Sequence, residues 1–282
     1  MKKITRRSFM AAAGLTVAAL ALTACGGSSS TASSAAASSV ASSAAASSEA
    51  ASAAATELTT VEAGKLTMAT NAAFPPYEMT TDAGEFEGID IETAQAIADK
   101  LGLELQIDDM DFDAALLSVQ QGKADIVMAG VTVTDERKAV MDFSDSYATG
   151  IQSIIVPEGS DIASPDDLAG KKIGTQRGTT GYIYCSDDFG DENVVAYDDG
   201  LTAVQALNNG QVDAVVIDNA PAKEFVAANP GLVILDTSYA EEDYAIGVAK
   251  GSSLKGAVNA ALEELKADGT LQSIVDKYIT AE

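Results

Sequence analysis

The chain has 282 residues, with 17 basic residues against 42 acidic residues and no histidine. Its first 24 residues carry four of the basic residues, so the rest of the chain has 13 basic residues and a net charge of −29. This charge would repel phosphates and excludes nucleic acid as a partner, while the lack of histidine excludes Ser-His-Asp and Cys-His catalysis and most zinc sites. We expect no cofactor and no metal.

The N-terminus has the pattern of an export signal. Lys2, Lys3, Arg6 and Arg7 precede an apolar run over residues 11–22, which is too short for a stable spanning helix. The sequence Leu-Thr-Ala-Cys that ends at Cys25 resembles a lipobox, so we predict a lipoprotein signal peptide over residues 1–24 and lipidation of Cys25. The alternative is an unmodified leader cysteine. Residues 5–10 resemble a twin-arginine signal, and the export route stays open.

Residues 25–57 consist almost entirely of serine and alanine. They contain no aromatic residue and no apolar period, so they cannot bury a core. We interpret them as a flexible tether between the membrane and a folded part of residues 58–282. That part is long enough for two lobes of ordinary size.

Strand and helix patterns alternate along the folded part. Residues 65–70 predict a strand, residues 89–101 a helix that ends at Gly102, and residues 103–107 a second strand. A helix over 112–119 and a buried strand over 125–129 follow. Further strands are expected at residues 172–175, 194–197, 213–217 and 232–235. Such alternation predicts an α/β fold with mostly parallel sheets covered by helices.

Residues 114–128 are weakly similar in sequence pattern to residues 202–216. Each segment reads as a helix stopped by a glycine, then an aspartate three residues later, then a buried strand. This similarity indicates either two similar α/β units or only the pattern that is common wherever a helix is followed by a strand.

Two arginines remain after the leader, and both lie beside glycines and threonines. Arg137 follows Gly130 and Thr132, and Arg177 precedes Gly178 and Thr179. An arginine fork grips a carboxylate with two hydrogen bonds, and glycine lets the backbone approach a ligand. The pattern favours capture of a small anion-bearing molecule. For a single arginine the alternative is a surface residue in a turn.

Several short motifs occur in the order seen in one family. They cover residues 70–78, 88–92, 110–112, 129–137 and 142–147. Together they resemble the polar-amino-acid solute-binding proteins of bacterial ABC importers, family 3, over residues 66–278. The resemblance implies a two-lobe periplasmic-binding fold of type II, with lobe 1 at 58–150 and 246–282 and lobe 2 at 151–245. Crossing strands near 151–156 and 244–249 would form a hinge, and cleft closure would bury the ligand.

The resemblance also implies roles for residues around the cleft. Arg137 would hold the ligand α-carboxylate, and Gly130 and Thr132 would contact its main-chain groups. Asp218 would pair with the α-ammonium; its alternative role is a helix N-cap, because a helix pattern follows it. The second carboxylate clamp would be formed by Thr179 and Thr180 at a helix start, where free N–H groups favour an anion.

The remaining implied contacts concern the ligand side chain. Phe74 and Phe112 match aromatic walls, although each also suits an ordinary core. Asn71 matches a position where relatives that take cationic side chains often hold Asp, so we expect an uncharged polar amino acid such as glutamine. Arg177 either faces the cleft or is solvated beside the clamp. Cys185 is expected to be a small buried apolar residue.

The sequence therefore predicts a lipid-anchored, monomeric receptor on the extracytoplasmic face of the membrane. It would bind a free amino acid and present it to ABC permease subunits, with no catalytic residues. An amino-acid-precursor dehydratase of the same fold is one alternative. An extracytoplasmic amino-acid sensor is another, and a structural surface protein with an empty cleft is a third.

Overall fold

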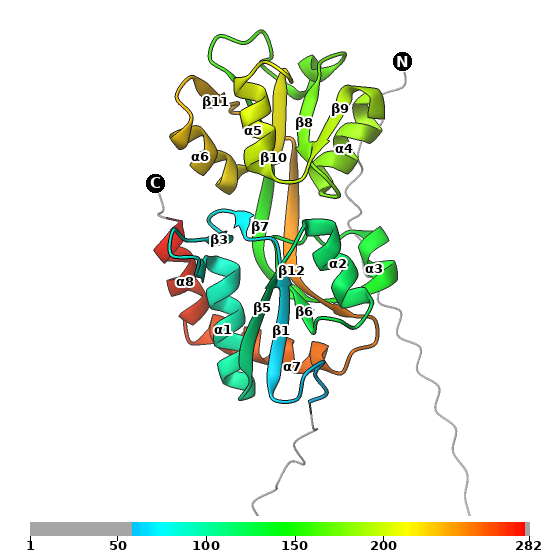
Figure 1. The fold of residues 1–282 in the computed structure, drawn as a ribbon, viewed down its shortest axis with the longest axis vertical. Helices are drawn as coiled ribbons and strands as arrows, with labels where there is room; N and C mark the ends of the chain where they lie inside the picture. The colour runs from blue at the N-terminus through cyan, green and yellow to red at the C-terminus, as the bar shows by residue number, and fades with distance from the viewer. Residues whose placement is uncertain (1–57, 280–282) are drawn as a thin grey trace, which may run out of the picture. The chain divides into compact units, whose positions relative to one another are not determined.

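The computed structural model describes residues 58–279, all of which belong to one compact unit. The predicted signal peptide, Cys25 and the Ser/Ala tether lie outside these described residues. After four initial strands, helices and strands alternate along most of the chain, as the sequence predicts (Figure 1). The first half contains β1 (Lys65–Thr70), β2 (Ala73–Phe74), β3 (Glu78–Thr80), β4 (Phe86–Glu87), α1 (Ile89–Leu101), β5 (Glu104–Asp109), α2 (Phe112–Gln120), β6 (Ile126–Val127), α3 (Asp135–Val140) and β7 (Met141–Pro157).

The second half repeats this alternation before two C-terminal helices. It contains the 3₁₀ turn η1 (Pro165–Leu168), β8 (Ile173–Gln176), α4 (Thr180–Phe189), the 3₁₀ turn η2 (Asp191–Asn193), β9 (Val194–Tyr197), α5 (Gly200–Asn208), β10 (Ala214–Asp218), α6 (Asn219–Ala228), β11 (Leu232–Ile234), β12 (Ala240–Ala249), α7 (Leu254–Ala267) and α8 (Thr270–Tyr278). The predicted helices at 89–101 and 112–119 are confirmed to within one residue. The predicted strand at 125–129 is shorter, because only Ile126 and Val127 pair.

One mixed sheet runs through the fold in the order β5-β1-β6-β12-β7-β10-β8-β9, with β11 also pairing with β7. The pairs β1–β5 and β1–β6 are parallel, as are β10–β8 and β8–β9. Between these parallel groups lie β7 and β12, which pair antiparallel with each other. The fold is therefore of the predicted two-lobe type, with β7 and β12 as the crossing strands.

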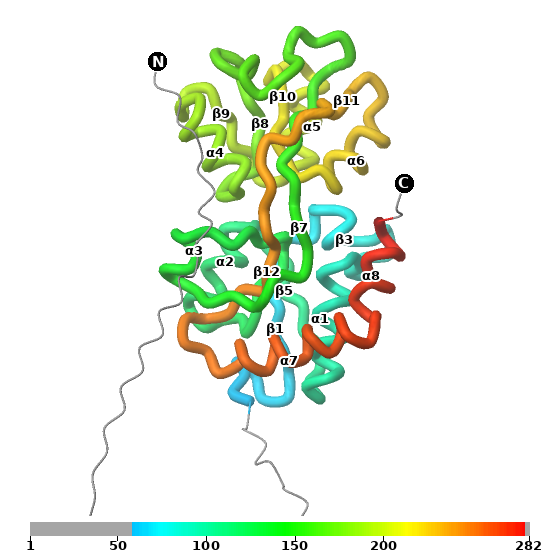
Figure 2. Tube along the Cα trace, turned by 180° about the vertical axis from the view of Figure 1, so that it is seen from behind, coloured from blue at the N-terminus to red at the C-terminus, as the bar shows by residue number. Residues whose placement is uncertain are grey.

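Both crossing strands are longer than predicted. β7 starts at Met141 and β12 at Ala240, so their pairing extends from Ala240 opposite Gln152 to Ala249 opposite Met141. Figure 2 shows the two strands side by side between the two groups of elements. The chain then returns, because α7 and α8 both contact α1 in the first group. The exact limits of the lobes at 58–150 with 246–282 and at 151–245 stay a prediction.

Each lobe has its own buried core, because each sheet face must be covered by helices. In lobe 1, side chains from β1, α1 and α7 form one cluster, and a second cluster lies under α2. In lobe 2, α5 and α6 cover one cluster, and the other includes Cys185 with no exposed area, which confirms its predicted burial. Among residues 58–279, no helix combines the length and the apolar character that a membrane span requires.

Candidate functional site

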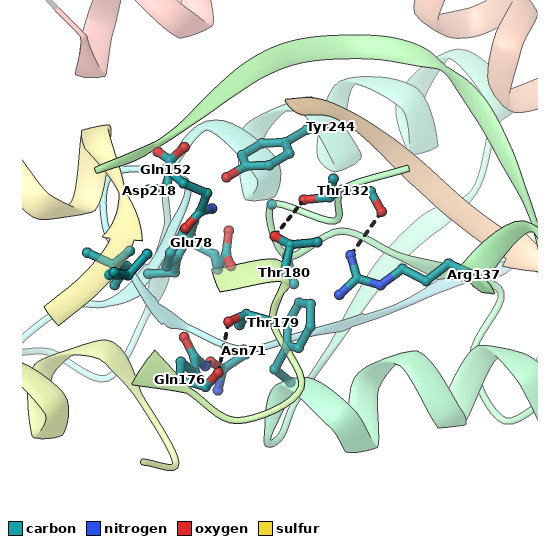
Figure 3. A pocket seen from close by; sticks show the side chains of 16 residues that line it. Asn71, Glu78, Thr132, Arg137, Gln152, Gln176, Thr179, Thr180, Asp218 and Tyr244 are labelled. Carbon is teal, nitrogen blue, oxygen red and sulfur yellow. Dashed lines mark hydrogen bonds between the residues drawn. The ribbon is translucent and has the colours of Figure 1, made fainter. Parts of the chain in front are cut away.

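A pocket lies where the two lobes meet, and its walls come from both of them (Figure 3). All nine residues that the sequence singled out for ligand contact line it. They are Asn71, Phe74, Phe112, Gly130, Thr132, Arg137, Thr179, Thr180 and Asp218. Seven more line it as well, namely Glu78, Ala129, Gln152, Gln176, Val216, Ile217 and Tyr244.

Strand ends position most of these groups. Asn71 directly follows β1, and Gly130 and Thr132 lie in the loop after β6. In the other lobe, Asp218 ends β10, while Thr179 and Thr180 follow β8. The carboxyl ends of parallel strands in both lobes therefore point at one space, which is where open α/β sheets bind ligands.

Arg137 lies in α3 and is 8% exposed. Its Nη1 donates to the carbonyl oxygen of Thr132 at 2.9 Å, and its Nη2 donates to the carbonyl oxygen of Gly178 in the other lobe at 3.2 Å. The guanidinium also lies over the Phe112 ring, 5.3 Å from the centroid. Burial lowers the pKa of Arg137, and the nearby charge of Glu242 partly offsets this effect. Three of its five N–H groups remain for other partners.

Asp218 is 2% exposed and has two roles in the structure. Its carboxylate caps α6 by accepting from the Ala220 N–H at 3.0 Å, and it accepts from the Ile151 N–H at 2.7 Å. The N-cap interpretation is therefore confirmed, yet the same side chain also lines the pocket. Burial raises the pKa of Asp218 to about 6. A buried cation would stabilise its charged form.

The start of α4 opens into the pocket. Thr179 is the N-cap: its hydroxyl donates to the Gln176 carbonyl at 2.8 Å and accepts from the Tyr182 N–H at 3.4 Å. The next residue, Thr180, is 3% exposed and donates its hydroxyl proton to Glu242 at 3.0 Å. A helix start also presents N–H groups that have no partner within the helix, and these suit an anion.

The aromatic walls differ in their surroundings. Phe74 stacks on Tyr77 at 5.8 Å between centroids and also packs against the core of lobe 2. A Cβ on Gly130 would lie 2.9 Å from the Phe74 ring, which is too close. Gly130 also has a φ of +55°, which other residues rarely adopt, so both the space and the backbone favour glycine here. Phe112 is buried in the second core cluster of lobe 1. Both rings thus serve the core and the pocket together.

The sequence analysis missed several polar residues of the lining, and it also missed Glu242, which lies behind the lining. Gln176 donates to the Asn71 side-chain oxygen across the pocket at 2.8 Å, and Gln152 donates to Glu242 at 3.0 Å. Gln152, Glu242 and Tyr244 belong to the crossing strands. The available signal for Gln152 was an amide next to the apolar residues Ile151, Ile154 and Ile155, and Glu242 carried a weaker signal because its neighbours are also charged.

Glu78 was missed too, and it is fully buried at the pocket wall. Both of its carboxyl oxygens are buried, and its polar neighbour is the carboxyl group of Asp90. Burial raises the pKa of Glu78 well above its ordinary value, and the neighbouring Asp90 raises it further. Asp90, whose pKa burial raises to about 6, accepts from the Gly130 N–H at 3.0 Å and from the Tyr147 hydroxyl at 2.8 Å. It thereby fixes the loop that carries Gly130.

Arg177, which the sequence left open, does not line this pocket. Its guanidinium donates to the Ala196 carbonyl at 3.3 Å and lies 3.6 Å from Asp198, and its side chain is 56% exposed. Of the two alternatives, the structure shows the solvated position. Among the described residues, no group of three or more acidic or cysteine side chains is arranged to hold a metal ion.

The sequence model of the bacterial extracellular solute-binding proteins, family 3, matches residues 66–281. The chain belongs to this family. It is 33% identical to the L-cystine-binding protein TcyJ of Escherichia coli K12 over 226 residues, which cover 78% of this chain and 85% of the relative. It is also 33% identical to the arginine-binding extracellular protein ArtP of Bacillus subtilis over 228 residues, covering 77% and 87%.

Solved structures agree with this assignment. An ancestral arginine-binding protein bound to glutamine is 42% identical, with a TM-score of 0.74, and the match covers 78% of this chain and all of that one. The arginine-, lysine-, histidine-binding protein ArtJ from Geobacillus stearothermophilus is 34% identical with the same TM-score, covering 77% and 96%. This member of family 3 is therefore an extracytoplasmic amino-acid-binding component of an ABC importer and not an enzyme.

Proposed function

We propose that this chain captures a free amino acid between its lobes and presents it to the permease subunits of its importer. The observation that carries this proposal is the placement of Arg137 and Asp218. They lie in opposite lobes, both are buried, and both line the same pocket (Figure 3). A cation and an acid so placed match the two charged ends of a zwitterion.

The contacts divide between these ends. The α-carboxylate would meet Arg137 and the N–H groups at the start of α4, while the α-ammonium would meet Asp218. Phe74 and Phe112 would cover the apolar part of the ligand. Because the polar groups already contact each other across the pocket, as Gln176 does with Asn71, the ligand joins an arrangement that is largely formed.

For the ligand side chain we propose an uncharged polar group such as the amide of glutamine. The supporting observation is the pair of amides, Asn71 and Gln176, 2.8 Å apart across the pocket. Amides offer donors and acceptors but no charge. A cationic amino acid is the second candidate, because the Glu242 carboxylate lies behind the lining residue Thr132 in a pocket whose lining has a single arginine. Arginine-binding proteins among the relatives support the same candidate.

We further propose that Cys25 carries the lipid and that residues 25–57 tether a monomeric binding unit to the membrane. Support comes from the lipobox pattern and the Ser/Ala composition. Metabolic labelling with a palmitate analogue would test the anchor. Wild-type protein should be labelled and released from membranes only by detergent, whereas Cys25→Ser should be neither labelled nor retained.

The ligand proposal is tested by a thermal-shift screen of the twenty amino acids. A ligand at 100 times its dissociation constant should add about 2.7 kcal/mol to the free energy of unfolding. We expect glutamine to give the largest shift, and a largest shift with arginine would favour the second candidate. A chain that no amino acid stabilises would contradict the proposal.

A further inference from the structure

Glu242 joins both lobes through a single oxygen atom. It lies on β12 and is 6% exposed. Its Oε2 accepts from the Thr132 hydroxyl at 3.1 Å, from the Thr180 hydroxyl at 3.0 Å and from the Gln152 amide at 3.0 Å. Thr132 belongs to lobe 1, Thr180 begins α4 in lobe 2, and Gln152 lies on the other crossing strand.

The direction of these hydrogen bonds has a consequence for the pocket. A threonine hydroxyl has one proton and two lone pairs. The two hydroxyl oxygens are 3.4 Å apart, whereas each lies closer to Glu242, and a carboxylate is the stronger acceptor. Both protons therefore go to Glu242. Since Thr132 and Thr180 both line the pocket, they present lone pairs to it rather than protons.

We propose that Glu242 is a positioning residue that sets ligand selectivity by holding the Thr132 and Thr180 hydroxyls as acceptors. Acceptors in this position favour a ligand with an ammonium group and disfavour an otherwise identical ligand without one. This inference rests on the proposed function, because it assumes that an amino acid occupies this pocket. It adds a role for a residue that does not itself line the pocket.

Two observations argue against a purely structural role. Glu242 Oε1 is buried and has no hydrogen-bond partner among the described residues, so the carboxylate is kept although one oxygen is left unpaired. In addition, Glu242 adds negative charge on the proton side of the two hydroxyls, and this charge favours a cation in the pocket, as the lone pairs do. This charge would attract the α-ammonium at the hydroxyl oxygens, so the α-carboxylate would meet Arg137 and the backbone N–H groups of α4 and not the Thr180 hydroxyl.

The test compares each amino acid with its analogue that lacks only the α-amino group. The pairs are L-glutamine with glutaramic acid, L-arginine with 5-guanidinopentanoic acid, and L-histidine with 3-(imidazol-4-yl)propanoic acid. Calorimetry on the pair that contains the tightest-binding amino acid gives a selectivity ratio of two dissociation constants. Wild-type protein should show a ratio of at least about 100, because the analogue leaves buried acceptors without a donor.

Glu242→Gln keeps the shape but can point its NH2 group at both hydroxyls. The hydroxyls would then accept from this amide and release their protons toward the pocket. We expect the selectivity ratio to fall at least about tenfold, mainly through weaker binding of the amino acid. Glu241→Gln is the matched control, because it makes the same change on the exposed neighbour in β12 and should leave the ratio unchanged.

Glu242→Leu is the second variant and removes the acceptor altogether, so its ratio should fall as well. Equal losses for both members of a pair, or an unchanged ratio in both variants, would overturn the inference while leaving amino-acid binding intact. A wild-type protein that binds none of the three amino acids would instead contradict the proposed ligand classes, and the inference would fall with them.

Discussion

The carboxylate of Asp113 lies against the backbone of Gly178 from the opposite lobe. A Cβ at Gly178 would lie 1.6 Å from Asp113 Oδ1, and the φ of Gly178 is +72°. The same glycine accepts from Arg137 through its carbonyl oxygen. Gly178 is therefore a point at which α2 and α3 of one lobe meet the loop before α4 of the other.

Gly178→Ala should weaken ligand binding, because the contact between the lobes at Gly178 leaves no room for a methyl group unless Asp113 moves. We expect a rise in dissociation constant of about fivefold to thirtyfold, equivalent to about 1–2 kcal/mol. Calorimetry with the ligand found in the screen would measure it. Gly210→Ala is the control, since Gly210 has a similar φ of +66° but open space around its Cβ position. It should lower the melting temperature without changing affinity. Equal affinity losses in the two variants would contradict this role.

Arg137→Ala should weaken binding by about 3–5 kcal/mol, because it leaves a desolvated ligand carboxylate without its partner. That is roughly a 10²- to 10⁴-fold rise in dissociation constant. The variant also loses the hydrogen bond to Gly178, so closure should be impaired as well. Arg177→Ala changes the other arginine beside the cleft, which is exposed and outside the pocket lining, and should bind almost normally. An Arg137→Ala protein with wild-type affinity would exclude this residue from the site.

Much of this site was predictable because its residues sit in short motifs. Arg137 follows a loop that carries a glycine and a threonine, and Asp218 ends a buried strand, so the resemblance of these motifs to the family placed both residues at the cleft. Gln152 and Glu242 were not predictable in this way. They are 90 residues apart, and they meet because β7 and β12 pair over a long antiparallel register. That register depends on where both strands start, and the limits that the resemblance implied placed both starts too late.

Asp218 combines two roles that the sequence analysis treated as alternatives. The sequence pattern offered ligand contact or an N-cap, and the structure shows one carboxylate that caps α6 and lines the pocket. Capping fixes its orientation, because two backbone N–H groups hold its oxygens. The hydrogen bonds that cap α6 thus also hold the Asp218 carboxylate in place for ligand binding.

Asp218 should make ligand affinity depend on pH. Burial raises its pKa from 3.8 to about 6, and an ammonium binds the ionised form. Between pH 7 and pH 5 most of the free protein gains a proton at Asp218, which the ligand must displace. The dissociation constant should therefore rise about tenfold over this range. Asp218→Asn should bind weakly at every pH, with a flatter profile.

The stability of the free protein should move in the opposite direction. Between about pH 4 and pH 6 the folded state binds more protons at Asp218 than the unfolded state, so the free energy of unfolding falls as pH rises through this window. Acidification to pH 5 should thus raise the contribution of Asp218 to the free energy of unfolding, because its buried carboxylate becomes neutral. The same change should weaken ligand binding. Thermal melts of wild type and Asp218→Asn separate this effect from the general charge of the chain. Affinity and stability that rise together on acidification would contradict the assignment.

Asn71→Asp should shift the ligand preference toward cationic amino acids. The Asn71 side-chain oxygen accepts from Gln176 at 2.8 Å, and an aspartate keeps this acceptor while adding a negative charge. The charge would lie at a residue that is only 9% exposed, where screening by solvent is weak. We expect the ratio of arginine to glutamine affinity to rise at least about tenfold. Competition calorimetry with both amino acids measures this ratio directly.

Asp108→Asn, on the neighbouring strand β5 and outside the pocket lining, controls for a general change of charge and should leave the ratio unaltered. A ratio that stays constant in Asn71→Asp would place the ligand side chain away from the Asn71–Gln176 pair.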